Sequence, residues 1–459
     1  MIAAAYSAAL SLAGPLLRLR LAWRARSEPL YGEQVDERFG RYDPAALAEL
    51  IRWRSIPGPR LWLHAVSLGE TRAATALVAA LRARRPGLRI LWTHGTATGR
   101  SAGAEMLGPG DLQLWQPFDT PGAVRRFHDA AAPTAGVLME TEIWPNLCAE
   151  ARRRGMPLVL ANARLSARSL RSGQRWSALL QPAVAGLSCV LAQTEEDAER
   201  LVQAGADRRR LQVAGNLKFD VSPPPQQLAL GRTWKRALQR PVVMMASSRE
   251  GEEAALLQSW KASLGTMSGP ASATRPLLLL VPRHPQRFDA VAALVSAAGL
   301  RGVRRSRFGE AMPVRSDLDA DVWIGDSLGE MPAYYGLSDV ALLGGSFAPL
   351  GGQNLIEAAA CACPVLMGPH TFNFADAAQG AVAAGAALEV PDLPAAVAEA
   401  LAWLVDPGTE GRRRAGLAFA ARHRGAALRM AAAIDVFLAP PDPGAARALA
   451  SLSSEPADR

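Results

Sequence analysis

The sequence has few of the residues that build disulfide frameworks and metal sites. Its 459 residues include only four cysteines and six histidines. The cysteines are scattered among apolar neighbours, and Cys361 and Cys363 lack the further ligands of a zinc site. The histidines show no metal-ligand spacing either. We therefore expect buried thiols in a reducing compartment and no bound metal.

Two widespread phosphate-binding signatures are also missing. Neither the GxGxxG spacing of dinucleotide-binding domains nor the GxxxxGK[ST] spacing of nucleoside triphosphatases occurs in the chain. Their absence argues against dinucleotide redox chemistry and against nucleoside triphosphate hydrolysis.

The formal net charge is +9, but the basic residues are not gathered in one tail. No recognition helix or interleaved aromatic and basic pattern is present, so we do not expect a nucleic-acid partner. An anionic lipid, an acidic substrate or the composition of a high-GC genome remain as explanations of the charge. Seven arginines between residues 152 and 175 form either a solvated surface or a clamp for phosphates on an acceptor.

The N-terminus carries an uncharged run, residues 1–17, with no charged region before it, which is a poor fit to a cleaved signal peptide. Its length is at the lower limit of a membrane-spanning helix, about 17–25 residues. Arginines follow it in the segment RLRLAWRAR, and the positive-inside rule then keeps the bulk of the protein cytoplasmic. We expect residues 1–22 to be a membrane anchor that either spans the bilayer or lies at its interface.

Apolar runs of strand length alternate with helical stretches over most of the chain. Strands are expected at 61–66, 89–94, 112–117, 135–140, 157–162 and 189–193, and again at 241–247, 277–282, 321–326, 339–345, 364–368 and 386–390. Because these strands are apolar on both faces and separated by helices, each series indicates a parallel sheet covered on both sides. The chain length likewise favours two domains of roughly 200 residues each.

Three consecutive prolines lie between the two series of strands. They fall in the segment VSPPPQQ, residues 221–227, and cannot continue a helix or a central strand, so a linker is predicted there. The expected fold class is α/β, with two doubly wound Rossmann-like domains that face a cleft. The expected bounds are 1–22 for the anchor, 23–221 for the N-terminal domain, 222–240 for the linker, 241–437 for the C-terminal domain and 438–459 for a loose tail.

Charged residues follow several first-half strands, at the strand ends where ligands of such sheets bind. Ser67 and Glu70, after the first strand, fit a capping box, and a chemical role of Glu70 is the alternative. Glu140 and Glu142 are either an acid–base pair or charges that stabilise a helix N-terminus. Lys218 follows another strand near the expected crevice, where a cation would meet an anionic donor.

In the second half, Arg283 ends an all-leucine strand, which suggests a phosphate or carboxylate contact. Ser327 and Glu330 repeat the opening arrangement at the start of another helix. The segment GGSFAPLGGQNLIEAAA, residues 344–360, has four glycines around a loop that enters a helix. Free backbone N–H groups of such a loop bind phosphate, and Glu357 could accept from ribose hydroxyls. A capped helix after a tight loop is the structural alternative.

Taken together, these motifs resemble one enzyme family. HAVSLGE, METEIWPNL, NARLSARS, GNLKFD, VPRHPQRF, GDSLGEM and GGSFAPLGGQNLIEAAA are similar to segments of the 3-deoxy-D-manno-octulosonic acid (Kdo) transferases of Gram-negative bacteria. The resemblance runs from about residue 20 to 435, and the N-terminal apolar stretch matches that family's membrane anchor. It implies a GT-B fold, an acceptor-binding N-terminal domain and a CMP-sugar-binding C-terminal domain. The implied reaction moves Kdo from CMP-Kdo onto a tetraacylated lipid A precursor at the cytoplasmic face of the inner membrane, with inversion and without a metal or other cofactor.

The resemblance also implies roles for particular residues. Glu70 matches the catalytic base, and Glu140 and Lys218 match transition-state stabilisers. The CMP-binding segments correspond to Pro282, Arg283, Leu328, Gly329, Glu330, Asn354, Leu355, Ile356 and Glu357. Gln353 stands where some relatives have histidine. The dipole of the following helix is expected to hold Glu70 ionised and ready to accept a proton.

Three rival functions remain from the sequence alone. The first is another GT-B sugar-nucleotide enzyme, such as an epimerase, which would share the second-half loop. The second is a non-catalytic membrane-bound sensor of nucleotide sugars. The third is a basic nucleic-acid binder, whose affinity would fall steeply with salt.

Overall fold

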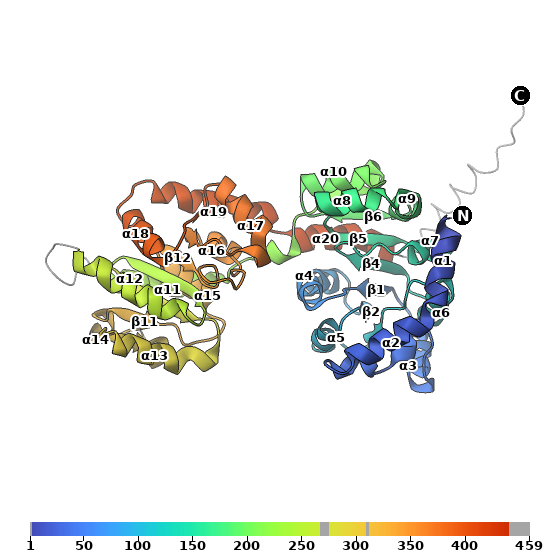
Figure 1. Cartoon of the computed structure of the whole chain (residues 1–459), viewed down its shortest axis with the longest axis horizontal. Coiled ribbons are helices and arrows are strands. Elements are labelled where there is room, and N and C mark those ends of the chain that lie inside the picture. The colour runs from blue at the N-terminus through green and yellow to red at the C-terminus, as the bar shows by residue number, and fades with distance from the viewer. Residues whose placement is uncertain (1, 267–274, 309–311, 440–459) are drawn as a thin grey trace, which may run out of the picture. The chain divides into compact units, whose positions relative to one another are not determined.

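The computed structural model describes residues 2–266, 275–308 and 312–439 (Figure 1). The chain divides into two compact units. The first unit contains the residues up to Asp220 together with the segment from Gly425 onward, and the second runs from Val221 to Arg424. Each unit has one parallel sheet with helices packed against it, so the α/β prediction is confirmed.

The first unit is built on a sheet of seven strands in the order β3-β2-β1-β4-β5-β6-β7. The strands are β1 Arg60–His64, β2 Arg89–His94, β3 Leu112–Trp115, β4 Ala135–Met139, β5 Leu158–Ala163, β6 Cys189–Ala192 and β7 Leu211–Val213. In the register of the central strands, Leu61 lies opposite both Ile90 and Ala135. The chain order reverses between β1 and β4, and in such sheets ligands bind at the carboxyl ends of the strands beside this switch point.

Helices cover both faces of the first sheet because successive side chains of the buried strands point to opposite sides. Val137 packs with Leu77 and Met430 on one face, while Trp62 packs with Phe127 on the other. The helices are α3 Pro44–Ser55, α4 Leu68–Arg84, α5 Ala97–Ala104, α6 Pro121–Ala131, α7 Pro145–Arg153, α8 Ala167–Gln174, α9 Ser177–Ala185, α10 Glu195–Gln203 and α20 Ala426–Asp435. The 3-10 turns are η1 Pro29–Gly32, η2 Val35–Phe39, η3 Arg208–Arg210, η4 Leu217–Phe219 and η8 Val436–Leu438.

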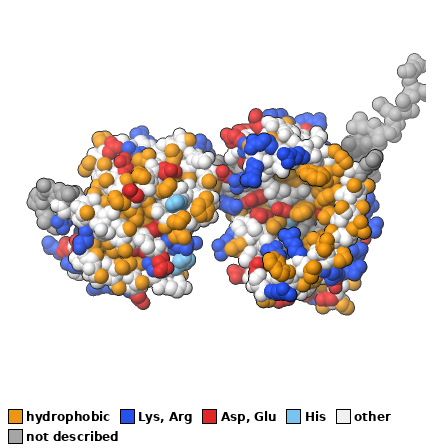
Figure 2. Space-filling view, in the orientation of Figure 1, with side chains coloured by type: hydrophobic (Ala, Val, Ile, Leu, Met, Phe, Trp, Pro, Cys, Tyr) orange, Lys and Arg blue, Asp and Glu red, His pale blue; other side chains and the backbone are white. Residues whose placement is uncertain are grey.

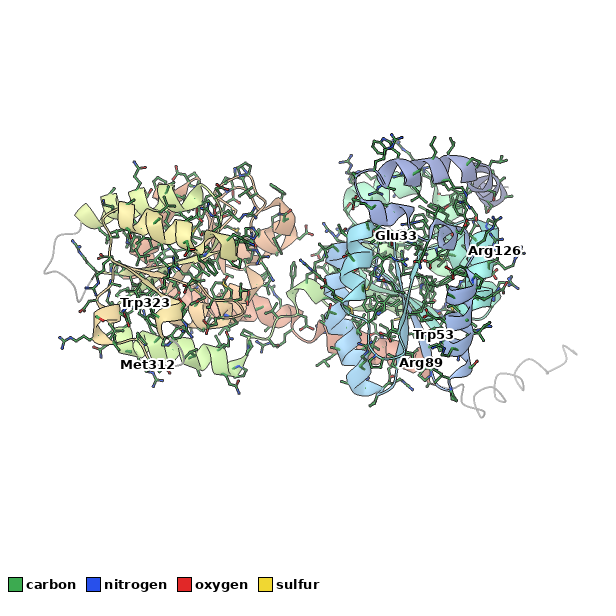
Figure 3. The ribbon with its side chains drawn as sticks, turned by 90° about the horizontal axis from the view of Figure 1, so that it is seen from below. Glu33, Trp53, Arg89, Arg126, Met312 and Trp323 are labelled. Carbon is green, nitrogen blue, oxygen red and sulfur yellow. The ribbon has the colours of Figure 1, made fainter. Side chains whose placement is uncertain are left out.

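A buried arginine fixes the end of α3 to the sheet. Arg89 in β2 donates to the backbone carbonyls of Trp53 and Ile56, and its guanidinium lies 5.9 Å from the Trp53 ring centroid (Figure 3). The last carbonyls of a helix have no partner within the helix. Arg89 supplies that partner, so a charged residue inside an apolar strand has a structural role here.

The second unit repeats the plan with the strand order β10-β11-β9-β8-β12-β13-β14. Its strands are β8 Val242–Ser248, β9 Leu277–Pro282, β10 Gly302–Arg304, β11 Val322–Ile324, β12 Val340–Leu343, β13 Val365–Met367 and β14 Ala387–Glu389. Its helices are α11 Pro225–Leu238, α12 Glu252–Thr266, α13 Phe288–Ala297, α14 Arg315–Leu318, α15 Met331–Leu337, α16 Ile356–Ala360, α17 Ala375–Ala383, α18 Leu393–Trp403 and α19 Thr409–His423, with 3-10 turns η5 Pro285–Arg287, η6 Arg305–Phe308 and η7 Phe372–Phe374. The switch point lies between β8 and β12.

The twelve expected strands all occur, with ends shifted by a few residues, but two strands were missed. β7 and β10 are three-residue strands at sheet edges, and each has at least one exposed residue. Each contains no more than two apolar side chains. Its sequence therefore lacks the continuous apolar run by which the other strands were found.

The expected linker and domain bounds are corrected by two helices. Residues 225–238 of the expected linker 222–240 form α11, which packs on α15 and belongs to the second unit. The third proline of the segment, Pro225, stands at the first helical position, where its missing N–H costs nothing. At the other end, α20 leaves the expected domain 241–437 and packs on α4 of the first unit. Of the expected tail, 438–459, the residues from 440 onward lie outside the described part of the chain.

The expected anchor 1–22 is two helices, α1 Ile2–Leu12 and α2 Gly14–Arg24, bent by 52° at the break between them. Neither helix alone is long and apolar enough to cross a membrane, although the pair together passes that test by length and composition. Both helices contact the rest of the first unit. Tyr6 donates to Asp119 at 3.0 Å, and Arg18 pairs with Asp36 at 2.5 Å.

The packing of α20 on the first unit generates a stability prediction. Met430 is 0% exposed in α20, so Met430→Ala should lower the free energy of unfolding of the first unit by about 2–5 kcal/mol through lost burial and a residual cavity. Leu428 on the same helix is 64% exposed, and Leu428→Ala should change it by less than about 0.5 kcal/mol. Urea titration followed by hydrogen exchange of first-unit amides measures both. Equal effects of the two substitutions would contradict the assignment of α20 to this unit.

Candidate active site

Glu70 lies in the first turn of α4, directly after the carboxyl end of β1. Its Oε2 accepts from the backbone N–H of Val66 at 2.8 Å, and its Oε1 accepts from the Ser67 hydroxyl at 2.8 Å. The Ser67 side chain in turn accepts from the Glu70 N–H at 3.3 Å. The capping interpretation is therefore correct, with the difference that Glu70 binds the N–H of Val66 rather than that of the cap residue.

The carboxyl group of Glu70 is largely buried, with 9% of the residue exposed. Burial raises the pKa of Glu70, the hydrogen bonds from Val66 and Ser67 oppose this, Glu140 raises the pKa further, and Lys218 lowers it. The helix dipole was expected to favour the ionised form of Glu70, and burial acts in the opposite direction. Desolvation outweighs the local hydrogen bonds, and it makes this carboxylate a stronger base than an exposed glutamate.

Glu140 and Lys218 form an ion pair beside Glu70. Glu140 follows β4 directly, and its Oε1 lies 2.7 Å from Lys218 Nζ. The backbone of Glu140 is left-handed, with φ of 56°, a conformation that costs a non-glycine residue about 1–3 kcal/mol and that concentrates at functional sites. Lys218 lies in η4 and keeps 39% of its side chain exposed. The pair thus joins the switch-point strand to a turn from the far edge of the sheet.

A chain of buried amides holds the turn that carries Lys218. Asn162, at the end of β5, accepts from the N–H of Leu217 at 2.9 Å. Gln193 donates to the carbonyl of Asn162 at 3.0 Å and accepts from Asn216 at 2.8 Å, and Asn216 accepts from the N–H of Lys218 at 2.9 Å. Asn162 also has a left-handed backbone, with φ of 52°. These buried hydrogen bonds hold the turn that carries Lys218 in one geometry, although the Asn162 side-chain nitrogen has no partner among the described residues.

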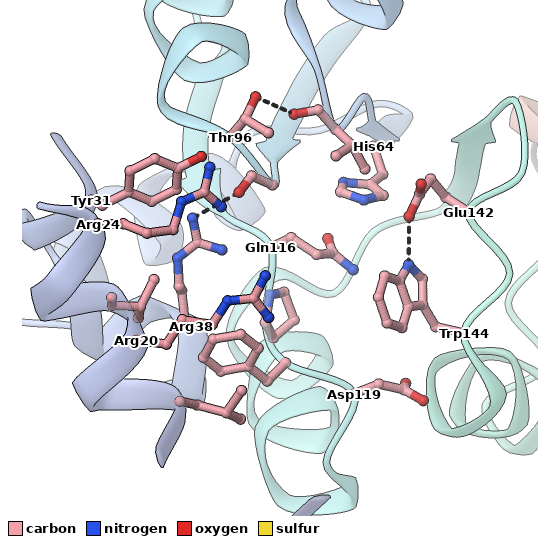
Figure 4. Close-up of a pocket in the computed structure, with 16 residues that line it drawn as sticks. Arg20, Arg24, Tyr31, Arg38, His64, Thr96, Gln116, Asp119, Glu142 and Trp144 are labelled. Atoms are coloured by element: carbon pink, nitrogen blue, oxygen red, sulfur yellow. Dashed lines mark hydrogen bonds between the residues drawn. The ribbon is translucent and has the colours of Figure 1, made fainter. Parts of the chain in front are cut away.

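A third carboxyl group, that of Glu142, belongs to the same cluster. It accepts from the indole N–H of Trp144 at 2.9 Å (Figure 4). Its pKa is raised to about 7, mainly by burial and also by the charges of Glu70 and Glu140, against the Trp144 hydrogen bond, which lowers it. Glu140 and Glu142 thus lie in the turn between β4 and α7, which begins at Pro145, and their acid–base role stays a prediction.

The predicted site residues of the second unit lie at the carboxyl ends of its strands. Pro282 ends β9. The backbone N–H of Arg283 donates to the Ser248 carbonyl at 3.0 Å, and the Arg283 side chain is exposed. Glu357 lies near it in α16. Burial raises the pKa of Glu357, and the positive charge of Arg283 opposes this. Arg283, which follows β9, and Glu357, in the helix after β12, are thus brought near each other.

The second predicted segment, Leu328 to Glu330, differs in detail from the expectation. α15 begins only at Met331, with Glu330 at its cap position, so the arrangement of Ser67 and Glu70 is not repeated. Glu330 accepts from the Ser327 hydroxyl and pairs with Arg305 at 2.8 Å. Leu328 is 74% exposed, and Gly329 has a φ of 76°, a left-handed conformation that favours glycine.

The glycine-rich loop is less open to an anion than its sequence indicates. The N–H of Gly345 donates to both carboxylate oxygens of Glu252, at 2.9 and 2.8 Å, and the N–H of Phe347 donates to the same group at 3.2 Å. These two amides hold a protein carboxylate and are not free for phosphate. Asn354 accepts from the N–H of Ile356 at 3.0 Å, so it stabilises the entry to α16, with Leu355 buried beside it.

Two further expectations concern arginines and metals. Arg153 and Arg154 both bind Glu150, and Arg154 also pairs with Asp129, so part of the arginine-rich segment is engaged within the protein rather than open to phosphates. Within the described ranges, no group of three or more His, Cys, Asp or Glu side chains is arranged to hold a metal ion. All four cysteines are free and buried, as expected.

Sequence reasoning missed the residues that support the site. Asn162, Gln193 and Asn216 act through Lys218 and stand in apolar or loop contexts, where an amide gives no signal of its own. Glu252 was also missed, because its partners are backbone amides of a loop about 95 residues away in the sequence. The left-handed backbone of Asn162 marks this residue in the structure, but sequence does not display such a conformation outside glycine.

Comparisons with known proteins identify relatives of the chain. The family model of 3-deoxy-D-manno-octulosonic-acid transferase (kdotransferase) matches residues 33–221. A 3-deoxy-D-manno-octulosonic acid transferase of Bordetella pertussis is 49% identical over 94% of this chain and 99% of its own length. One from Haemophilus influenzae is 34% identical, over 90% of this chain and 92% of its own.

Among solved structures, the C-terminal CMP-Kdo binding domain of an Acinetobacter baumannii protein is 30% identical and covers 42% of this chain and 95% of that domain, with a TM-score of 0.37. A UDP-GlcNAc 2-epimerase of Neisseria meningitidis covers 82% of this chain and 99% of its own at 13% identity and a TM-score of 0.50. That second likeness concerns the fold alone and agrees with the GT-B type expected. The extent and level of identity to the two transferases show that the chain belongs to the Kdo transferase family and is a glycosyltransferase.

Proposed function

We propose that the protein transfers Kdo from CMP-Kdo to a hydroxyl of a tetraacylated lipid A precursor with inversion, and that Glu70 is the base. In this reaction the acceptor hydroxyl oxygen bonds to C2 of Kdo as the bond from C2 to the phosphate oxygen breaks. The hydroxyl proton passes to Glu70, and CMP leaves with the electron pair of the broken bond. A base with a raised pKa suits this step, because proton transfer is most efficient when the pKa of the base lies near the working pH.

One observation carries the proposal. Glu70, Glu140 and Lys218 come from three separate segments and meet at the carboxyl ends of β1 and β4, where the strand order reverses. A structural cap needs only Ser67 and Glu70, and it gives no reason for a second carboxylate and a lysine beside them. The grouping therefore supports chemistry at this point rather than capping alone.

Lys218 and Glu140 have a joint role in this proposal. The ammonium group of Lys218, which is partly exposed, can attract the negative charge that develops as the donor breaks, and such preorganised charges are worth most in a site that excludes water. Glu140 holds the ammonium at 2.7 Å and so positions it. The pair thereby stabilises the transition state, as the family resemblance implies.

In the second unit we assign CMP binding to the loops that follow β9, β11 and β12. The exposed guanidinium of Arg283 would bind the CMP phosphate, and Glu357 beside it would accept from ribose hydroxyls. Pro282, Leu328 to Glu330 and Asn354 to Ile356 would shape the remainder of the nucleotide site. Because Glu252 takes the amides of Gly345 and Phe347, side chains rather than those amides would carry the phosphate contact.

The N-terminal helices support a membrane location, which we place at the cytoplasmic face of the inner membrane. Four large apolar side chains of this segment are exposed at helical spacing, namely Leu12, Leu16, Leu19 and Trp23, and we call them the apolar stripe. Hydrophobic side chains gather over α1 and α2 in the space-filling view, with basic side chains near them (Figure 2). An apolar stripe beside arginines is typical of a helix that lies in a membrane interface.

Replacing the base should stop transfer without preventing donor binding. Glu70→Gln keeps a side chain that can accept from Val66 but removes the proton acceptor, so the rate constant of Kdo transfer should fall by about 10²- to 10⁴-fold. Affinity for CMP, measured by isothermal titration calorimetry, should stay within about twofold, because the substituted residue lies in the other unit. A mass spectrum of the lipid product measures transfer.

Ser67→Ala is the matched control, because it removes the cap and one hydrogen bond of Glu70 but keeps the carboxylate. It should destabilise the first unit by about 0.5–2 kcal/mol and retain most of the transfer rate. If Ser67→Ala lost as much activity as Glu70→Gln, or if Glu70→Gln turned over at the wild-type rate, Glu70 would be structural and the base assignment wrong.

The ion pair should set the acidic limb of the pH–rate profile. The base works only when deprotonated, so kcat/KM falls as pH drops through the raised pKa of Glu70. Lys218 lowers this pKa, so Lys218→Met should move the limb to higher pH. Glu140 raises it, so Glu140→Gln should move the limb to lower pH. Two substitutions that only damaged the fold would lower the rate at every pH and leave the limb in place, which would contradict the assignment.

A further inference from the structure

The described part of the first unit contains a pocket of about 270 Å³ that the reaction scheme above does not use. Arg20 and Arg24 of α2 border it on one side and Glu142 with Trp144 on the other, with Arg38 and Gln116 between them (Figure 4). Val66, whose N–H binds Glu70, also lines the pocket. The pocket therefore opens beside the proposed base, between the N-terminal helices and the strand ends.

A buried cation in the pocket has no carboxylate partner. Arg38 is 5% exposed and donates to the carbonyl of Gly95 at 3.0 Å, with its guanidinium 4.0 Å from the Trp115 ring centroid. Arg38 forms no ion pair within the described part of the chain. Its pKa is lowered to about 10, mainly by burial and also by Arg100 and Arg24, whereas Tyr31 and Glu37 raise it. A buried charge that forms no ion pair is costly, so the surroundings of Arg38 favour an anion.

Two buried hydrogen-bond acceptors in the same pocket have no partner among the described residues. Gln116 is 7% exposed, and its Oε1 accepts no hydrogen bond. His64 is fully buried, and its Nδ1 lies 3.0 Å from the carbonyl oxygen of Thr93. The Thr93 hydroxyl lies 2.9 Å from the same nitrogen, and Nε2 of His64 has no partner; with the proton on Nδ1, directed at the carbonyl, Nε2 accepts. Unpaired acceptors call for a ligand that brings O–H or N–H donors.

The edge of the pocket continues onto the apolar stripe. Arg20 lines the pocket, and it also borders the surface formed by Leu16, Leu19 and Trp23 of the apolar stripe. Arg20 is exposed, and Arg24 lies 4.0 Å over the ring of Tyr31. A ligand in the pocket could thus keep an apolar part against the stripe and an anionic part against these two arginines.

We propose that this pocket binds the phosphorylated sugar headgroup of the acceptor, with Arg20, Arg24 and Arg38 facing a phosphate and with Gln116 and His64 accepting from sugar hydroxyl or amide groups. The acyl chains then lie along the apolar stripe, and the acceptor hydroxyl faces Glu70. The inference rests on the proposed function, since it assigns the acceptor to this unit. It adds a site, a ligand chemistry and five residues that the reaction scheme did not require.

The test compares two acceptors and two charge-matched variants. Arg20→Ala combined with Arg24→Ala should raise KM for the phosphorylated lipid acceptor by about tenfold or more, because charge-assisted hydrogen bonds are lost, and leave KM for CMP-Kdo unchanged. The same variant should match the wild type on an acceptor whose phosphates have been removed. Arg41→Ala combined with Arg52→Ala removes the same charge from exposed positions outside the pocket, and should leave all these constants unchanged.

Gln116→Leu separates the sugar contacts from the phosphate contacts, and it should raise KM for both acceptors. Acceptor binding to Glu70→Gln protein, measured by calorimetry, follows the pocket without turnover and so distinguishes this inference from the base assignment. The inference is overturned if the Arg20 and Arg24 variant keeps the wild-type KM. It is equally overturned if the KM of that variant rises by the same factor for the phosphorylated and the dephosphorylated acceptor.

Discussion

The ion pair between Lys218 and Glu140 is the contact on which the candidate site depends. It joins β4 at the centre of the first sheet to a turn that follows β7 at the sheet edge, and the amides of Asn162, Gln193 and Asn216 fix that turn. Its two charges act on Glu70 in opposite directions, so the basicity of Glu70 depends on their balance. A change anywhere in this network therefore reaches the proposed base through electrostatics as well as geometry.

Desolvation gives the site its chemical character. Glu70 and Glu142 lose water at the strand ends, and burial raises the pKa of each, to about 7 for Glu142. In the neighbouring pocket Arg38 loses water without gaining a carboxylate. Perturbed groups of this kind cluster where proteins bind and transform ligands, because folding alone would favour apolar side chains at such positions. The fold supports this cost with two well-packed apolar layers around the sheet.

The sequence was sufficient for the architecture and for the residues that stand directly after strands. Alternating apolar strands and helices predicted two parallel sheets, and HAVSLGE and GNLKFD placed Glu70 and Lys218 at strand ends, where the structure has them. Neighbouring residues alone did not reveal that α11 would follow the prolines or that α20 would pack on the first unit, because both depend on contacts between distant segments. The occupation of Gly345 and Phe347 by Glu252 is likewise a tertiary contact.

The central claim is that burial beside Glu140 and Lys218 raises the pKa of Glu70 and makes its carboxylate a stronger base than an exposed glutamate. A pH titration of carbon-13-labelled glutamate carboxyl carbons by NMR, with the Glu70 signal assigned by its loss in Glu70→Gln, measures this directly. The account predicts that Glu70 titrates above the ordinary range of a glutamate and at the pH where the transfer rate falls. A Glu70 signal that titrates at or below the ordinary range, apart from the fall in rate, would contradict it.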